Sequence, residues 1–192
     1  MDKSWLNVPN ILSLSRIVFL PLLYIFVIFD MRLAFLITFI ILGSTDYFDG
    51  LIARKFKVVS SVGKRLDSIA DLFFYLSTAW FFYMLYAAYL MPNILFLVAF
   101  LGVLLVSFIV STWRCKKPVM MHTQILRLNA VNVFMLVILS HFMNTTWYVM
   151  LILIIFIIGF IEEMLIFILY GQVDPDIRSI FLLIGKKRDA IS

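Results

Sequence analysis

The sequence has few charged residues and one cysteine. Asp, Glu, Lys and Arg make up 14% of its 192 residues, whereas 64% are hydrophobic and the mean hydropathy is +1.08. This lack of charge excludes an ordinary soluble domain, in which about a quarter of the residues are charged. A lone cysteine, Cys115, excludes an internal disulfide and a metal site built from several cysteines. The composition therefore predicts an integral membrane protein, with one domain over residues 1–192.

Long apolar runs recur along the chain, separated by short polar or turn-forming segments. A membrane-spanning helix needs roughly 20 mostly apolar residues. No small-residue cleavage site follows the first run, so we expect a retained helix rather than a signal peptide. The sequence predicts an all-α polytopic fold with six transmembrane helices, near residues 11–29, 33–54, 67–90, 93–112, 125–143 and 147–170.

Lys and Arg are distributed unevenly between the two sides of this arrangement. Cytoplasmic loops retain basic residues, and here the basic residues fall before the first span, after the second, fourth and sixth, with only Arg32 on the other side. Both termini are therefore predicted to be cytoplasmic, and the tail over residues 172–192 is predicted to lie at the membrane interface. The net charge of +5 is explained by this topology and by anionic membrane lipids, so no nucleic-acid partner is expected.

Four aspartates lie where the second span ends and the third begins: Asp46, Asp49, Asp67 and Asp71. A charged side chain at the centre of a spanning helix costs about 2.5–3.5 kcal/mol on insertion scales, so four acids require compensation. Helical spacing allows the two pairs to face each other. Hard oxygen donors suit Mg²⁺ or Mn²⁺, and this number of ligands is compatible with two ions. Helix capping, or ion pairs with neighbouring Arg and Lys residues, is the structural alternative.

Small residues accompany the acids. Gly50, Ala53 and Gly63 leave the helix surfaces bare, so a ligand can approach the backbone there. Arg54 offers a planar guanidinium that suits phosphate oxygens. Acids, metal ions, bare backbone and an arginine together predict a site for a diphosphate.

The pattern Asp46-x-x-Asp49-Gly50-x-x-Ala53-Arg54, followed after eight residues by Gly63-x-x-x-Asp67-x-x-x-Asp71, resembles the signature of the CDP-alcohol phosphotransferase family. The resemblance implies that the four aspartates bind the metal ions and that Asp71 is also the general base. It implies transfer of a phosphatidyl group from CDP-diacylglycerol to a small alcohol in phospholipid biosynthesis, with release of CMP. It further implies a homodimer in the inner, or cytoplasmic, membrane, with the active site facing the cytoplasm. The implied nucleotide-binding residues are Asp46, Asp49, Gly50, Ala53, Arg54, Gly63 and Asp67.

The acceptor alcohol is less well indicated. The run from Asn7 to Ile17, with Arg16, resembles the start of phosphatidylglycerophosphate synthases, which favours glycerol 3-phosphate. Those enzymes usually have Pro and Lys where this chain has Ser68 and Leu72, and the run from Asp67 to Asp71 looks more like phosphatidylserine synthases. Serine and inositol phosphate remain alternatives. A phosphorylated acceptor would need cations near the metal site. Candidates for that role are Arg114, Lys116, Lys117 and Arg127.

A membrane cation or proton transporter is the alternative from another functional class, because intramembrane carboxylates also line ion pathways. Transport predicts acids spread through the bilayer, whereas the signature acids cluster on one side. Arg16 is expected to face the helix bundle or reach the surface, and Glu162 or Glu163 is expected to pair with Arg16 or Arg127. The aromatic stretch from Phe73 to Tyr89 is expected to face lipid or to form an interfacial belt, rather than to bind a cofactor.

Overall fold

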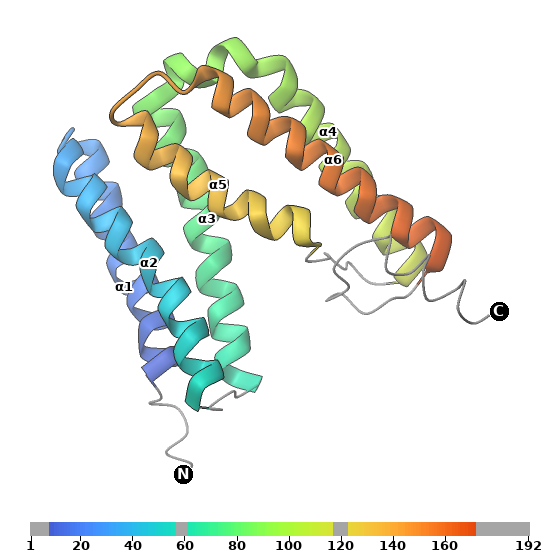
Figure 1. Ribbon diagram of the computed structural model, residues 1–192, viewed down its shortest axis with the longest axis horizontal. Helices are drawn as coiled ribbons and strands as arrows, with labels where there is room; N and C mark the ends of the chain where they lie inside the picture. The colour runs from blue at the N-terminus through green and yellow to red at the C-terminus, as the bar shows by residue number, and fades with distance from the viewer. Residues whose placement is uncertain (1–7, 57–60, 117–122, 172–192) are drawn as a thin grey trace. The chain divides into compact units, whose positions relative to one another are not determined.

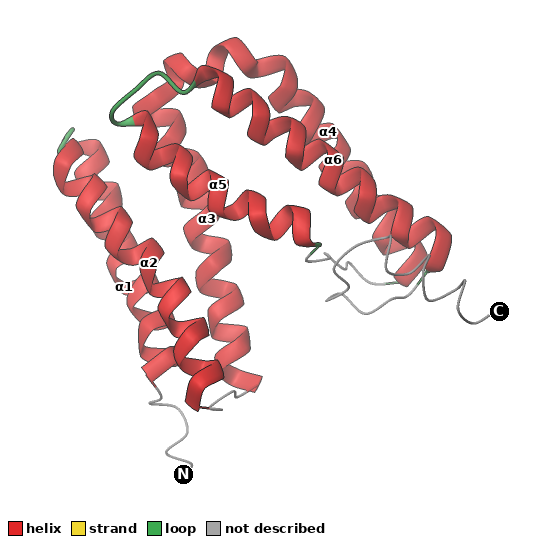
Figure 2. Cartoon of the chain, viewed as in Figure 1, coloured by secondary structure: helices red, strands yellow, loops and turns green. Residues whose placement is uncertain are grey.

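The computed structural model describes residues 8–56, 61–116 and 123–171, with side chains for 11–45, 69–116 and 123–171. Within these ranges all regular structure is helical (Figure 2). The elements are α1 (Val8–Ile28), α2 (Arg32–Phe56), α3 (Ser61–Leu90), the short 3-10 turn η2 (Met91–Asn93), α4 (Ile94–Cys115), α5 (Gln124–Ser140) and α6 (Thr146–Tyr170).

The helices confirm the all-α prediction, and each predicted span coincides with one of them. Their ends differ from the predicted spans, most of all in α3, which begins at Ser61 rather than near residue 67. Lys and Arg have high helix propensity, so Lys64 and Arg65 allow the helix to begin before the apolar run begins. The predicted hairpin break at Met91–Asn93 is the η2 turn.

The chain divides into two compact units, Met1–Ala87 and Ala88–Ser192, each with its own packing. The first unit contains α1, α2 and most of α3 (Figure 1). Tyr24 of α1 donates a hydrogen bond to Ser77 Oγ of α3 at 2.8 Å, and the Phe39 ring of α2 stacks on Phe74 of α3 at 5.3 Å. From these contacts and those of Phe35 with Phe81, α3 runs parallel to α1 and antiparallel to α2.

Aromatic side chains form the core of this unit. Phe81 is fully buried, and its ring lies 4.8 Å from that of Tyr24 and 5.3 Å from that of Phe35. The expectation that the Phe73–Tyr89 stretch faces lipid is therefore only partly right, because one face of α3 is buried and another is exposed. Phe73 and Tyr83 are exposed, whereas four aromatic residues are buried: Phe74, Phe81, Phe82 and Tyr86.

In the second unit, α4 and α6 run parallel and α5 runs antiparallel to α6. Asn93 Nδ2 donates to Thr146 O at 2.8 Å where α4 and α6 begin, and Arg114 Nη2 donates to Ile168 O at 3.0 Å near their ends. Between α5 and α6, a Cβ atom added to Gly159 would come within 2.7 Å of Leu126 Cδ2. The absence of a side chain at Gly159 therefore allows this close approach of the two helices.

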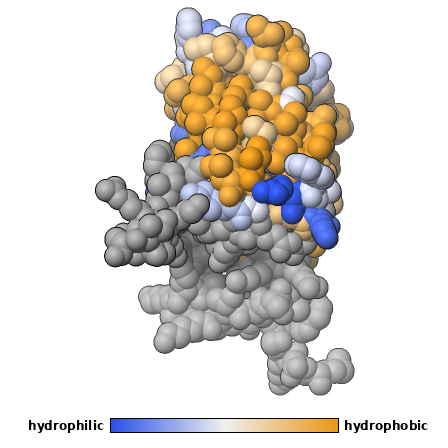
Figure 3. Space-filling view, turned by 90° about the vertical axis from the view of Figure 1, so that its right-hand side faces the viewer, coloured by the Kyte–Doolittle hydropathy of each residue, from blue (hydrophilic) through white to orange (hydrophobic). Residues whose placement is uncertain are grey.

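Three described stretches are long and apolar enough to cross a membrane: Ile11–Ile28, Ile69–Cys115 and Thr146–Tyr170. The middle stretch includes parts of two helices, α3 and α4. Most of the coloured surface in Figure 3 is hydrophobic, as expected for contact with lipid. The chain is thus an integral membrane protein.

Two other helices, α2 and α5, also belong to the six predicted spans. The apolar parts Arg32–Thr45 of α2 and Gln124–Ser140 of α5 are shorter. At 1.5 Å per residue, α5 is only about 25 Å long, less than a typical hydrocarbon core of roughly 30 Å. Six spans and cytoplasmic termini remain predictions.

Candidate active site

The signature residues lie on the last turns of α2 and the first turns of α3. Asp46 and Asp49 belong to the final eleven residues of α2, and Asp67 and Asp71 to the first eleven of α3. In Figure 1 these two helix ends lie at the same end of the first unit, where α1 also begins. The local fold therefore gathers the four positions at one end of the three helices.

The stacked rings of Phe39 and Phe74 set the register between the two helices. Position 46 follows Phe39 by seven residues, and position 67 precedes Phe74 by seven. Seven residues make almost two full turns, so each position lies on the same helix face as the stacked ring, about 10 Å further toward the shared end. The register thus places positions 46 and 67 opposite each other. Asp49 lies one turn nearer that end, and Asp71 one turn farther from it.

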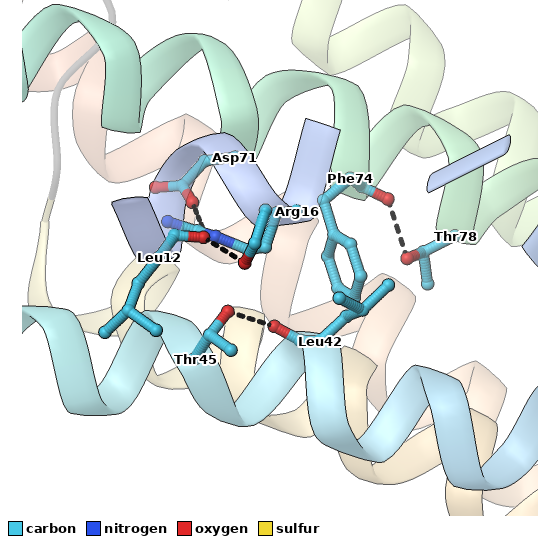
Figure 4. Close-up of polar contacts among 8 residues, drawn as sticks. Leu12, Arg16, Leu42, Thr45, Asp71, Phe74 and Thr78 are labelled. Carbon is cyan, nitrogen blue, oxygen red and sulfur yellow. Dashed lines mark hydrogen bonds and ion pairs between the residues drawn. The ribbon is translucent and has the colours of Figure 1, made fainter. Parts of the chain in front are cut away.

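Asp71 is the signature acid whose side chain is described, and it pairs with Arg16 of α1. Arg16 Nη1 donates to Asp71 Oδ1 in an ion pair that joins the first and third helices (Figure 4). The arginine side chain is 2% exposed and that of Asp71 33% exposed. The prediction that Arg16 faces the helix bundle is confirmed. One partner of Arg16 is a signature acid, a contact that the spacing of residues in the sequence does not indicate.

Thr45, which precedes the first signature acid, lies in the same region of α2 (Figure 4). Its hydroxyl donates to Leu42 O at 2.6 Å, one turn earlier. This bond occupies the hydroxyl within its own helix, as is common for threonine in apolar helices. The Thr45 hydroxyl hydrogen is therefore used within α2 and is not donated to another helix.

These residues fit a divalent metal site. The register brings the signature positions of two antiparallel helices to the same end of the first unit, and the carboxylate oxygens of aspartate are ligands that Mg²⁺ and Mn²⁺ prefer. Among residues with described side chains there is no group of three or more His, Cys, Asp or Glu that could hold an ion. That finding does not bear on the predicted ligand set, because the side chains of Asp46, Asp49 and Asp67 lie outside the described residues, as do those of Gly50, Ala53, Arg54 and Gly63.

The predicted acceptor-phosphate residues belong to the second unit. Arg114 and Arg127 are exposed, and Lys116 is exposed at the end of α4, with a left-handed backbone at φ 56°. Lys117 lies outside the described residues. Because Arg114 donates to the backbone of α6, part of its hydrogen-bonding capacity serves the unit itself. A common role for these cations stays a prediction.

Glu162 and Glu163 are buried in α6, with exposed fractions of 8% and 2%. The parallel register of α4 and α6 places the buried Ser107 and Ser111 within about a turn of them. Buried polar groups in a membrane helix bundle usually contact one another or the backbone. We assign these residues to the polar interior of the second unit.

Comparison with known proteins identifies a family and several relatives. The sequence profile of the family described as CDP-alcohol phosphatidyltransferase matches residues 6–161, which is most of the chain. The chain is 42% identical over 66 residues to the CDP-diacylglycerol–glycerol-3-phosphate 3-phosphatidyltransferase of Aquifex aeolicus and 38% identical over 80 residues to that of Bacillus subtilis. It is 37% identical over 82 residues to the CMP-forming cardiolipin synthase of Streptomyces coelicolor.

These similarities to individual proteins are partial. The matched stretches cover 34%, 34% and 38% of this chain, and 37%, 42% and 37% of the respective relatives. No solved structure matches the chain. The profile match, by contrast, runs through both compact units and includes every signature position.

Proposed function

Because the chain belongs to the CDP-alcohol phosphatidyltransferase family, we propose that it transfers the phosphatidyl group of CDP-diacylglycerol to an alcohol and releases CMP. The observation that carries this proposal is the complete signature on the adjoining ends of α2 and α3. A transporter would use acids distributed along a pathway, whereas positions 46 to 71 occupy a few turns at one end of the first unit.

In the proposed reaction, an acceptor hydroxyl oxygen attacks the phosphorus atom that carries diacylglycerol. A new phosphorus–oxygen bond forms, the bond to the CMP phosphate breaks, and the hydroxyl proton passes to the Asp71 carboxylate. Asp46, Asp49, Asp67 and Asp71 would hold two Mg²⁺ or Mn²⁺ ions, which neutralise the diphosphate and stabilise the leaving phosphate. Nucleotide contacts are proposed for Gly50, Ala53, Arg54 and Gly63, together with the first three acids.

Glycerol 3-phosphate is the proposed acceptor. The activity for which the Aquifex and Bacillus relatives are named supports it, and so does the amino-terminal run that contains Arg16. The cations Arg114, Lys116, Lys117 and Arg127 suit an acceptor phosphate. Serine and inositol phosphate are the competing acceptors.

The test is CMP release by the purified full-length protein in detergent with CDP-diacylglycerol and Mg²⁺. Each acceptor is offered separately, with and without EDTA. We expect glycerol 3-phosphate to give the highest rate and EDTA to reduce that rate to background, because the proposed diphosphate site depends on divalent ions. A higher rate with serine would show that serine is the acceptor and would leave the proposed reaction type unchanged. Absence of CMP release with every acceptor would refute the proposed transferase.

We also propose six spans with both termini in the cytoplasm. Trp113, near the end of α4, and Trp147, at the start of α6, are each 78% exposed. From the parallel register of the two helices, they lie about 19 residues, or roughly 29 Å, apart along the helix axes. Tryptophan concentrates at membrane interfaces, and the hydrocarbon core is roughly 30 Å thick. This spacing supports a membrane crossing between them.

Topology is measured with an impermeant maleimide on intact cells. Cys115 is buried and is replaced by serine, and a cysteine is then introduced at Asn144 or at Lys116, both of which are exposed. We expect labelling of Asn144→Cys alone, with Lys116→Cys reacting only after the membrane is permeabilised. The reverse pattern would place the active site on the outer side. We further propose a homodimer, because the family resemblance implies one. Light scattering of the detergent-solubilised protein measures its oligomeric state.

A further inference from the structure

Arg16 connects α1 to the proposed active site. It is the only charged residue between Val8 and Ile28, and it is 2% exposed. Its guanidinium contacts the Asp71 carboxylate, and Figure 4 shows the two side chains extending toward each other from α1 and α3. The signature residues all belong to α2 and α3, and Arg16 brings a residue of α1 into contact with one of them.

The position of Arg16 does not depend on this ion pair alone. Two turns further along α1, Tyr24 Oη donates to Ser77 Oγ at 2.8 Å, and the Tyr24 ring packs 4.9 Å from that of Trp80. Ser13, one turn before Arg16, is 3% exposed. The packing of α1 against α3 thus holds the guanidinium close to Asp71, so little conformational entropy is lost when the pair forms.

The positive charge of Arg16, held next to the Asp71 carboxylate, has two consequences for the predicted metal ligands. The hydrogen bond from Nη1 restricts the rotation of the carboxylate and orients it. A divalent ion bound by the same carboxylate shares it with the guanidinium, and like charges repel each other. Arg16 therefore opposes ion binding in the free protein. The diphosphate of a substrate adds negative charge that offsets this opposition.

We propose that Arg16 is a positioning residue, which orients Asp71 and weakens divalent-ion binding until a diphosphate is present. This inference rests on the proposed function, because it takes Asp71 to be a metal ligand and the general base. It assigns Arg16 no contact with the reacting atoms. The inference predicts that removing the charge of Arg16 raises the affinity for Mn²⁺ and lowers kcat.

The experiment compares Arg16→Gln with the wild-type full-length protein in detergent. Mn²⁺ affinity without substrate is measured from the electron paramagnetic resonance signal of free Mn²⁺, and CMP release is measured at saturating substrate. We expect Arg16→Gln to bind Mn²⁺ about tenfold more tightly, because a repelling charge is removed, and to show a kcat at least about tenfold lower, because Asp71 is no longer oriented. Arg16→Lys keeps the charge and should restore the Mn²⁺ affinity to within about threefold.

The matched control is Arg32→Gln, which removes an exposed arginine of the same unit. Arg32 Nε pairs with Asp30 Oδ1 at 2.9 Å, far along α2 from the signature acids. This variant should leave both quantities unchanged. Arg16→Met, which is neutral and similar in length, repeats the comparison if the glutamine variant is not monodisperse.

A purely structural role for Arg16 predicts weaker Mn²⁺ binding together with slower CMP release. Weaker or unchanged Mn²⁺ binding in the neutral variants, with an active wild type, would overturn the inference and leave the proposed transferase standing. A wild type that neither binds Mn²⁺ nor releases CMP would overturn both.

Discussion

Asp71→Asn protein is expected to release CMP at least about a thousandfold more slowly than the wild type. Loss of a general base alone typically costs 10²- to 10⁴-fold in rate, and asparagine is also a poorer metal ligand than a carboxylate. Asparagine keeps the size of the side chain and an oxygen that can accept from Arg16. The measurement is kcat at saturating CDP-diacylglycerol and acceptor.

A stability measurement must accompany this test, since the buried Arg16 loses its charged partner and an uncompensated buried charge can cost up to about 3–5 kcal/mol. Asp30→Asn is the matched control, because Asp30 pairs with Arg32 at the exposed start of α2. We expect that control to retain the wild-type rate. A folded Asp71→Asn protein that keeps more than about a tenth of the wild-type kcat would exclude Asp71 as the base.

Phe81→Ala should have the largest effect on stability. The ring is fully buried in the first unit and packs against Tyr24, Phe35 and Trp80, with ring-centre separations of 4.8, 5.3 and 5.6 Å. Truncation of such a phenylalanine leaves a cavity and costs about 3–5 kcal/mol. For a chain of this size we expect a decrease in Tm of roughly 10 °C in detergent.

Phe73→Ala is the control for the Phe81 variant, because it removes the same side chain from an exposed position of the same helix. Its Tm should stay within about 2 °C of the wild-type value. Equal decreases in the two variants would mean that the aromatic cluster does not hold the first unit together. The aromatic stretch would then contribute through lipid contact, as the sequence alone suggested.

The helices of this protein are predictable from sequence because long apolar runs have few alternatives in a bilayer. The ends are less predictable, since hydropathy records where the apolar run stops and not where the helix stops. α3 illustrates the difference with its start at Ser61. Hydropathy also cannot separate a lipid-facing phenylalanine from a buried one, so Phe73 and Phe74 look alike until packing is known.

The candidate site was identified from spacing, and the structure adds register and one contact. Residue spacing cannot show that Arg16 meets Asp71, because the two residues are 55 positions apart. Their contact depends on how α1 packs against α3. The side chains of Asp46, Asp49 and Asp67 lie outside the described residues, so their convergence on metal ions stays a prediction supported by the register of Phe39 and Phe74.

The separation of Arg16 and Asp71 also matters during synthesis. Ribosomes add about 5–20 residues per second, so Asp71 is made roughly 3 to 11 seconds after Arg16. During that interval α1 carries its charge into the translocation machinery or the bilayer before its partner from α3 exists. The apolar remainder of α1 must outweigh an insertion penalty of about 2.5–3.5 kcal/mol for an arginine near the helix centre. Arrival of α3 then cancels part of that penalty, so membrane insertion of the third helix secures the first.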